Sequence, residues 1–121
     1  MEAGIIFFAH GSSVESANEA VRKVAGDAAR QAGAARYEVA FLELAHPTLE
    51  EAAATLITNG LERITVVPYF LTLGIHLQRD LPAIVSRIAA ASPNIQISVT
   101  PPLDGHPGLA SVLADRVRNA T

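Results

Sequence analysis

The chain has 121 residues, of which half are hydrophobic and 17% are charged. This length and hydrophobicity suit a folded domain with a core and exclude a largely disordered protein. The net charge of −3 argues against a nucleic-acid-binding protein, and the lack of cysteine excludes disulfides, thiolate zinc sites and iron–sulfur clusters. The strong metal ligands that remain are histidines and carboxylates.

The first half of the chain alternates between apolar runs and amphipathic stretches. Residues 4–9 predict a strand, and residues 17–28 repeat small apolar side chains at helical spacing. A second strand is predicted over 37–42. The helix after it has an apolar face that begins at Leu49, and Gly60 is expected to cap its carboxyl end.

The second half repeats this alternation. A third strand is predicted over 64–67 and is followed by a longer loop. The third helix is expected to start with Asp80 as its N-cap and Pro82 in its first turn. A fourth strand over 95–99 leads through two prolines to a last helix with apolar residues over 109–117.

Four β-α units in succession predict an α/β fold, in which an open parallel sheet of four strands has helices on both faces. We expect a flavodoxin-like strand order of 2-1-3-4 and a single domain over residues 1–121, since no linker or low-complexity tract divides the chain. No basic leader precedes the first apolar run, and this run is too short to span a bilayer. The expectation is a cytoplasmic protein that contacts neither membrane nor nucleic acid.

Two histidines and a glutamate follow the apolar runs. His10 ends the first run and opens a Gly-Ser-Ser turn, Glu43 ends the second, and His76 lies in the loop predicted after the third. Open parallel sheets bind ligands beyond the carboxyl ends of their strands, where the strand order reverses. Because strands lie roughly 5 Å apart, the three side chains could converge within about 10 Å. Imidazole and carboxylate groups bind divalent metals and transfer protons.

Each of these positions also has a purely structural interpretation. His10 could bond to the backbone, and His76 could be a packed loop histidine. Ser12 and Ser13 could cap the first helix, although the amides of that turn could also hold an anion. A carboxylate such as Glu43 at the end of an apolar run is costly unless it is paired or exposed in a cleft.

Three further residues are less telling. His46 and His106 each precede a proline that suits the first helical position, which favours helix-start residues over ligands. Arg79 follows His76 by three residues and is either a solvated charge or a partner for a carboxylate on a ligand.

Several segments follow one another along essentially the whole chain in a familiar order. They are Ala9-His10-Gly11-Ser12, Phe41-Leu42-Glu43-Leu44-Ala45-His46-Pro47, Val67-Pro68-Tyr69-Phe70-Leu71, Gly74-Ile75-His76, Asp80-Leu81-Pro82, Pro101-Pro102-Leu103 and His106-Pro107. Together they resemble the class II tetrapyrrole chelatases, in particular the short, single-domain sirohydrochlorin cobaltochelatase (CbiX-type) group. Larger members of that family carry two lobes or extra C-terminal segments, whereas this chain has one lobe.

The resemblance implies an enzyme that inserts a divalent metal into sirohydrochlorin, a carboxylate-rich precursor of cobalamin and sirohaem. The metal ion would be a substrate, with Co²⁺ favoured and Fe²⁺ or Ni²⁺ as alternatives, and no organic cofactor is implied. Carried over by position, His10 and His76 would be the catalytic histidines and Glu43 the family's glutamate, and all three would contact the metal.

The resemblance also bears on substrate binding and assembly. Ser12, Ser13 and Arg79 are the candidates for binding the acidic arms of the macrocycle. Because larger members bind the macrocycle between two lobes, a single lobe implies a homodimer.

Two other functions remain open at the level of the residues. The same cleft could serve a non-catalytic carrier of metal or tetrapyrrole, which turnover would distinguish from an enzyme. Two histidines and a glutamate also make a catalytic zinc set, as in metal-dependent hydrolases. The chain has neither a His-Glu-x-x-His nor a Gly-x-Ser-x-Gly motif to support a hydrolase.

Overall fold

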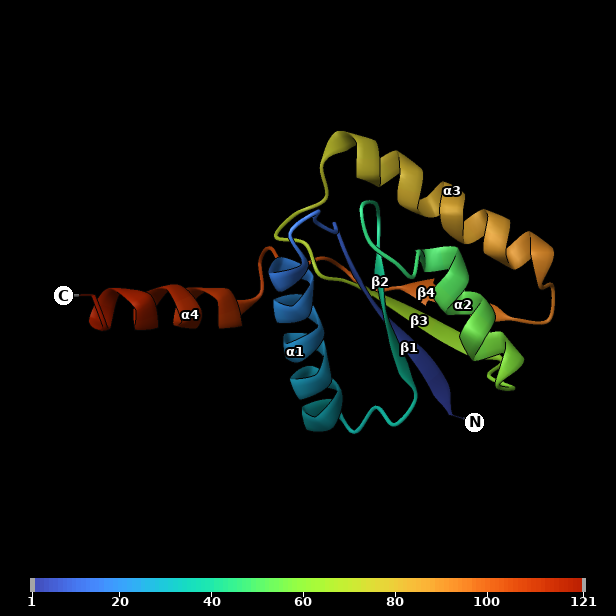
Figure 1. The fold of residues 1–121 in the computed structure, drawn as a ribbon, viewed down its shortest axis with the longest axis horizontal. Coiled ribbons are helices and arrows are strands. Elements are labelled where there is room, and N and C mark those ends of the chain that lie inside the picture. The colour runs from blue at the N-terminus through green and yellow to red at the C-terminus, as the bar shows by residue number, and fades with distance from the viewer. Residues whose placement is uncertain (1, 121) are drawn as a thin grey trace.

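The computed structural model describes residues 2–120, which form four strands and four helices in strict alternation. The elements are β1 (Ala3–Ala9), α1 (Glu15–Ala32), β2 (Tyr37–Phe41), α2 (Leu49–Thr58), β3 (Arg63–Pro68), α3 (Ile75–Ala91), β4 (Gln96–Val99) and α4 (Pro107–Arg118). The strands pair in parallel in the order β2-β1-β3-β4, as the sequence predicts (Figure 1). Within residues 2–120, no helix is long and apolar enough to cross a membrane.

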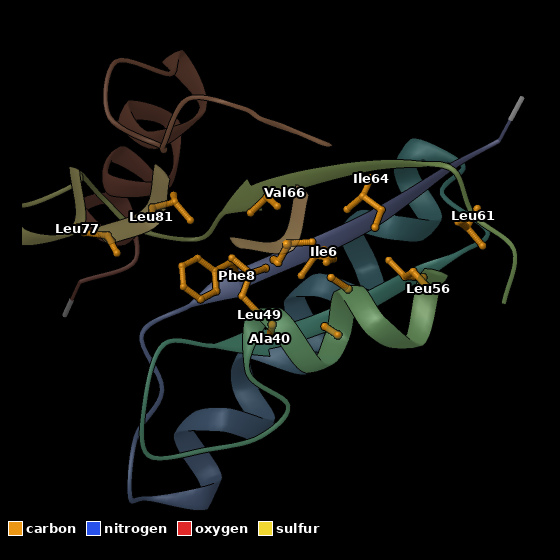
Figure 2. Packing of buried hydrophobic residues seen from close by; sticks show 13 residues of the cluster. Ile6, Phe8, Ala40, Leu49, Leu56, Leu61, Ile64, Val66, Leu77 and Leu81 are labelled. Atoms are coloured by element: carbon orange, nitrogen blue, oxygen red, sulfur yellow. The ribbon is translucent and has the colours of Figure 1, made fainter. Parts of the chain in front are cut away.

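The main core lies between the sheet and the helices α2 and α3. Alternate strand residues point into it, so Ile6 and Phe8 of β1 are fully buried while Ile5 and Phe7 between them are only half-buried. Figure 2 shows Ile6 and Phe8 beside Leu49 of α2. The buried members of the cluster are Ile6, Phe8, Ala40, Leu49, Ala52, Ala53, Leu56, Leu61, Ile64, Val66, Leu77, Leu81 and Ile88.

The strand register brings the loops after β1, β2 and β3 to one edge of the sheet. Ala9 lies opposite Phe41 of β2, and Phe8 lies opposite Pro68 of β3. The three strands therefore end side by side, and the residues that follow them emerge together. This carboxyl edge is where parallel sheets place their ligand sites.

Helix α3 begins earlier than the sequence suggests. Its first residue is Ile75 and its N-cap is Gly74, so the prediction that Asp80 caps this helix was wrong. Pro82 lies inside the helix, although a proline there removes one backbone hydrogen bond. The helix extends through it because Leu77 and Leu81, about one turn apart, are both buried against the core.

Helix α4 differs from the other three helices. The residues described in α4 include no buried one, whereas α1, α2 and α3 each bury several. Figure 1 shows α4 extending away from the sheet and from the helices that cover it.

The carboxyl end of α2 differs from the prediction by one residue. Asn59 is the C-cap of this helix, and Gly60, at φ +90°, follows the cap.

Candidate active site

His10 and Glu43 stand next to each other at the carboxyl edge. The parallel ladder continues beyond the ends of β1 and β2, since the Glu43 N–H donates to the His10 carbonyl at 3.1 Å. This pairing brings Nε2 of His10 within 3.6 Å of Oε1 of Glu43. Their side chains are 60% and 57% exposed, so the pair is open to solvent and to a ligand.

Gly11 permits this close approach of the two loops. Its φ is +92°, a conformation that residues with a side chain rarely adopt. A Cβ atom at this position would lie 1.9 Å from the carbonyl oxygen of Glu43. The glycine after His10 is thus needed to bring the β1 and β2 loops together.

His76 lines the same opening as His10. Both border a hollow of about 330 Å³, together with Leu42, Phe70, Thr72, Gly74, Ile75, Leu77 and Asp80. The prediction that His76 lies in a loop was wrong, because α3 starts at Ile75 and includes it in the first turn. On the His10 side, the imidazole meets the ring of Phe70 edge-on, with 6.4 Å between ring centroids.

The three side chains do not form a closed metal cage. Among residues 2–120, no group of three or more His, Cys, Asp or Glu side chains is placed to hold a metal ion. The arrangement is a histidine–carboxylate pair, with a second histidine that lines the same hollow as His10. A catalytic zinc site of a hydrolase needs three protein ligands, so this geometry does not favour that alternative.

Two hydrogen bonds from the side chain of Asn18 fix the turn that contains Ser12 and Ser13. The Ser12 N–H donates to Oδ1 of Asn18 at 3.0 Å, and Nδ2 of Asn18 donates to the Ser12 carbonyl at 2.8 Å. Helix α1 has Val14 as its N-cap without a side-chain cap, so the expectation that the serines cap it was wrong. Instead the Ser12 hydroxyl accepts the Val14 N–H inside the turn. The Ser12 amide is therefore engaged, and Ser13 is the exposed member of the pair.

Arg79 lies at the rim rather than in the hollow. Its Nε donates to Oδ1 of Asp80 at 3.1 Å, and its side chain is 73% exposed. Asp80 is the member of this pair that lines the hollow. Arg79 would have to exchange this partner for a carboxylate on a ligand.

Three exposed apolar residues, next in sequence to Glu43, Phe70 and His76, were missed by the sequence analysis. Leu44, Leu71 and Ile75 are 66%, 67% and 80% exposed, and they belong to the segments that follow β2 and β3. Leu44 has a φ of +66°, in the left-handed region that favours glycine. Ile75 itself lines the hollow, and an exposed apolar group there suits a ligand with an apolar surface. The signal in the sequence was that these residues lie outside every predicted strand and helix.

His106 starts a helix as expected, with Pro107 as the first residue of α4, whereas the expectation that Pro47 takes the first helical position after His46 was wrong, because α2 begins at Leu49 with Thr48 as its N-cap. His46 Nδ1 lies 2.8 Å from Oε1 of Glu51, whose carboxylate also completes the capping box with Thr48 at the start of α2. The hydrogen bond with His46, followed by that from the Thr48 backbone, lowers the pKa of Glu51 below its usual 4.5. His106 is the N-cap of α4, and its Nδ1 accepts the Gly108 N–H at 2.9 Å.

The chain is similar to sirohydrochlorin chelatases in sequence. The sirohydrochlorin cobaltochelatase of Methanopyrus kandleri is 26% identical over 96% of this chain and 95% of its own length. The chloroplastic sirohydrochlorin ferrochelatase of Arabidopsis thaliana is 30% identical over 96% of this chain, but this match covers only 52% of the plant protein.

Solved structures show the same likeness. A CbiX protein of Marinobacter aquaeolei VT8 superposes with a TM-score of 0.85 and 33% identity, over 96% of this chain and 94% of its own. The chelatase SirB of Bacillus subtilis subspecies spizizenii, in complex with cobalt, has a TM-score of 0.91 and 28% identity, and the match covers 51% of SirB. The CbiX family model matches residues 4–120. The chain belongs to the CbiX family.

Proposed function

We propose that this chain is a chelatase that inserts a divalent metal into sirohydrochlorin. The observation that carries the proposal is the solvent-open pair of His10 and Glu43, together with the hollow that His10 and His76 both line. The relatives that are named sirohydrochlorin cobaltochelatase and ferrochelatase support the substrate and the reaction. The metal ion is a substrate that passes through the site.

The hydrogen bond at His10 supports a role for its outer nitrogen. Nδ1 lies 3.1 Å from the Gly11 carbonyl, which can only accept, so we assign the ring proton to Nδ1. In the neutral ring, Nε2 then carries the free lone pair. That nitrogen can bind the incoming metal or accept a proton from the macrocycle, and the carboxylate of Glu43 stabilises the imidazolium that results.

The charge balance of the reaction matches this site. A divalent metal replaces the protons on two pyrrole nitrogens, so the enzyme must accept protons while the metal loses its water ligands. We propose that His10 and His76 both act in these steps at the hollow that they share, with Glu43 as the electrostatic partner of His10. An open set of ligands favours a metal that binds and leaves again.

The borders of the hollow suit an acidic macrocycle. We propose that Leu44, Leu71 and Ile75 contact its apolar faces, and that Ser12, Ser13 and Arg79 bind its carboxylate arms. The chain has nine lysine and arginine residues in all, so few cations are available for this purpose.

We further propose that the working form is a homodimer. SirB is about twice as long as this chain, and one half of it matches the chain with a TM-score of 0.91. A second copy of this chain would supply the other half. Among metals we place Co²⁺ first, with Fe²⁺ and Ni²⁺ as alternatives, because relatives are named for both cobalt and iron.

The test is a metal-insertion assay. The purified chain is incubated anaerobically with sirohydrochlorin and each of the three metals in turn, and the absorbance of the macrocycle is followed. We expect several equivalents of metallated product per chain, at a rate above that of the reaction without protein. Binding of metal and macrocycle without turnover would contradict an enzyme and favour the carrier.

A further inference from the structure

Asn18, near the start of α1, is buried although its side chain is polar. Among residues 2–120 it is the only polar residue that is buried, with 4% of its surface exposed. Asparagine is a poor residue for a helix interior, because its side chain competes for backbone hydrogen bonds. A buried amide also costs free energy unless its donor and its acceptor are both engaged. The presence of Asn18 at this place therefore requires specific partners.

The partner of Asn18 is the backbone of Ser12, outside the helix. Oδ1 of Asn18 accepts the Ser12 N–H at 3.0 Å, and Nδ2 donates to the Ser12 carbonyl at 2.8 Å. One residue thus engages both ends of the amide. Neither bond involves the free N–H groups in the first turn of α1, so Asn18 does not cap its own helix. Its effect falls on the turn that follows β1.

One peptide unit connects Asn18 to His10. The Ser12 N–H and the Gly11 carbonyl belong to the same unit, which is trans, so the two groups point in opposite directions. Asn18 binds the N–H side, and on the other side the carbonyl oxygen lies 3.1 Å from Nδ1 of His10. Hydrogen bonds at the two ends of one unit also polarise each other. Asn18 therefore fixes the acceptor that the His10 ring uses.

The peptide unit before Gly11 is held as well. The His10 carbonyl accepts the Glu43 N–H at 3.1 Å, from the segment after β2. Gly11 lies between these two units with a φ of +92°, and a glycine rotates readily unless its neighbours are fixed. The backbone that carries His10 is thus defined from the β2 side by Glu43 and from the α1 side by Asn18.

We infer that Asn18 is a positioning residue that keeps the proton of the His10 ring on Nδ1 and the lone pair on Nε2. In an imidazole, the hydrogen bond made by one nitrogen determines which nitrogen carries the proton. Nε2 is the atom that lies 3.6 Å from the Glu43 carboxylate, and the proposed function needs its lone pair for a metal or a proton. The inference rests on the proposed function for its effect on turnover, but not for its effect on the tautomer.

Nuclear magnetic resonance can identify the tautomer of His10 directly. In the chain labelled with ¹⁵N, correlations between the ring nitrogens and the carbon-bound ring protons distinguish N–H from a lone-pair nitrogen. The measurement is made at about pH 8, where an imidazole is neutral. The chain has four histidines, and the signals that disappear in His10→Gln are those of His10. We expect the Nδ1–H form in the natural chain, and an Nε2–H form would overturn the inference without any variant of Asn18.

Two substitutions of Asn18 test the route through the peptide unit. Asn18→Ala removes both bonds with Ser12, so His10 should become a mixture of the two tautomers while the signals of His76 stay unchanged. Asn18→Asp keeps an oxygen for the Ser12 N–H and should retain the Nδ1–H form of His10. A folded Asn18→Ala variant with the natural His10 signals would overturn the inference, and so would loss of the Nδ1–H form in Asn18→Asp.

Thr48→Ala is the matched control for a loss of stability alone. The Thr48 hydroxyl accepts the Glu51 N–H at 3.2 Å at the start of α2, so this variant also removes a bond between a side chain and the backbone. It should lower the melting temperature without changing the signals of His10. An equal response of His10 to Thr48→Ala and Asn18→Ala would show a general effect of destabilisation and would overturn the inference.

Metal insertion provides the second measurement. Asn18→Ala should lower kcat about 10- to 100-fold, as other residues that orient a histidine ligand do, with a smaller change in KM for sirohydrochlorin. Thr48→Ala should keep the natural kcat. A loss confined to KM would indicate only a loosened serine turn and would overturn the inference. Because the tautomer measurement needs no turnover, a natural chain without insertion activity would refute the proposed function while the tautomer would still decide the role of Asn18.

Discussion

The core and the carboxyl edge of the sheet differ sharply in burial, although Phe8 in the core and His10 at the edge are only two residues apart in the chain. Phe8 is fully buried against α2 and α3, whereas the side chain of His10 is 60% exposed beside Glu43. The first region holds the sheet together, and the second contributes chemistry but little packing. The comparison teaches that fold and function should respond to different substitutions, even though the residues are almost adjacent.

The largest effect is expected in the core. Phe8→Ala removes a ring that packs on Phe70, with 5.7 Å between the ring centroids, and leaves a cavity. We expect a loss of about 3–5 kcal/mol in the free energy of unfolding. Chemical denaturation monitored by circular dichroism measures it. A loss below about 1 kcal/mol would contradict the view that this face carries the stability of the domain.

The histidines should show the opposite behaviour. His10→Ala and His76→Ala should each reduce metal insertion about 100-fold or more, because each removes a proposed metal ligand or proton acceptor. Both residues are exposed, so the denaturation midpoint should stay close to that of the natural chain. Natural insertion rates in both variants would remove the proposed roles.

Gly11→Ala should affect both stability and activity, because it alters the backbone between β1 and the candidate site. The added Cβ would clash with the Glu43 carbonyl oxygen, and the backbone φ of +92° is one that alanine rarely adopts. We expect a loss of stability of about 1–2 kcal/mol together with slower insertion, since the β2 loop must move. As a control, Gly33→Ala has a similar φ of +71° and nothing near its Cβ, so it should cost stability without slowing insertion. Equal kinetics in the two variants would argue against a role for the loop contact.

Glu43→Gln should have a smaller effect than either histidine variant. The amide keeps the shape of the side chain but cannot stabilise a charged His10 across 3.6 Å of partly exposed space. We expect the insertion rate to fall about tenfold with little change in macrocycle binding. The two quantities are separated by kcat and KM for sirohydrochlorin. An unchanged kcat would exclude Glu43 from the reaction.

The smallest effect lies at the start of α2. The pKa of Glu51 is lowered by its hydrogen bonds with His46 and Thr48, so the carboxylate stabilises the fold above its unfolded pKa and loses this contribution as the pH falls through the folded value. Glu51→Gln should therefore lower the melting temperature slightly near neutral pH, and the difference should vanish well below pH 4.5. A difference that grows in acid would have the wrong sign.

The sequence could predict the sheet because hydrophobic periodicity and chain order largely determine it. Four alternating units and the strand order were correct, and so was the edge to which His10 and Glu43 belong. The start of α3 could not be predicted, because Pro82 is typical of a first turn and only the burial of Leu77 and Leu81 extends the helix past it.

The placement of side chains was harder to predict from the sequence than the topology of the sheet. Strand ends bring residues to one edge, but they do not fix whether His76 joins the pair of His10 and Glu43, and here it shares a hollow with His10. The serine turn depends on a buried Asn18 six positions later, a contact that periodicity does not reveal. In α4, the apolar stripe predicts a buried face, but none of the described residues of α4 is buried, and the pattern does not specify which surface could cover the stripe.

Phe70 makes two contacts at once. Its ring borders His10, and its carbonyl accepts the hydrogen bond from Leu103 in the connection to α4. The same residue therefore lines the hollow and holds the connection that precedes α4. A ligand that displaces the Phe70 loop to widen the hollow must therefore also strain the backbone hydrogen bond that holds the connection to α4.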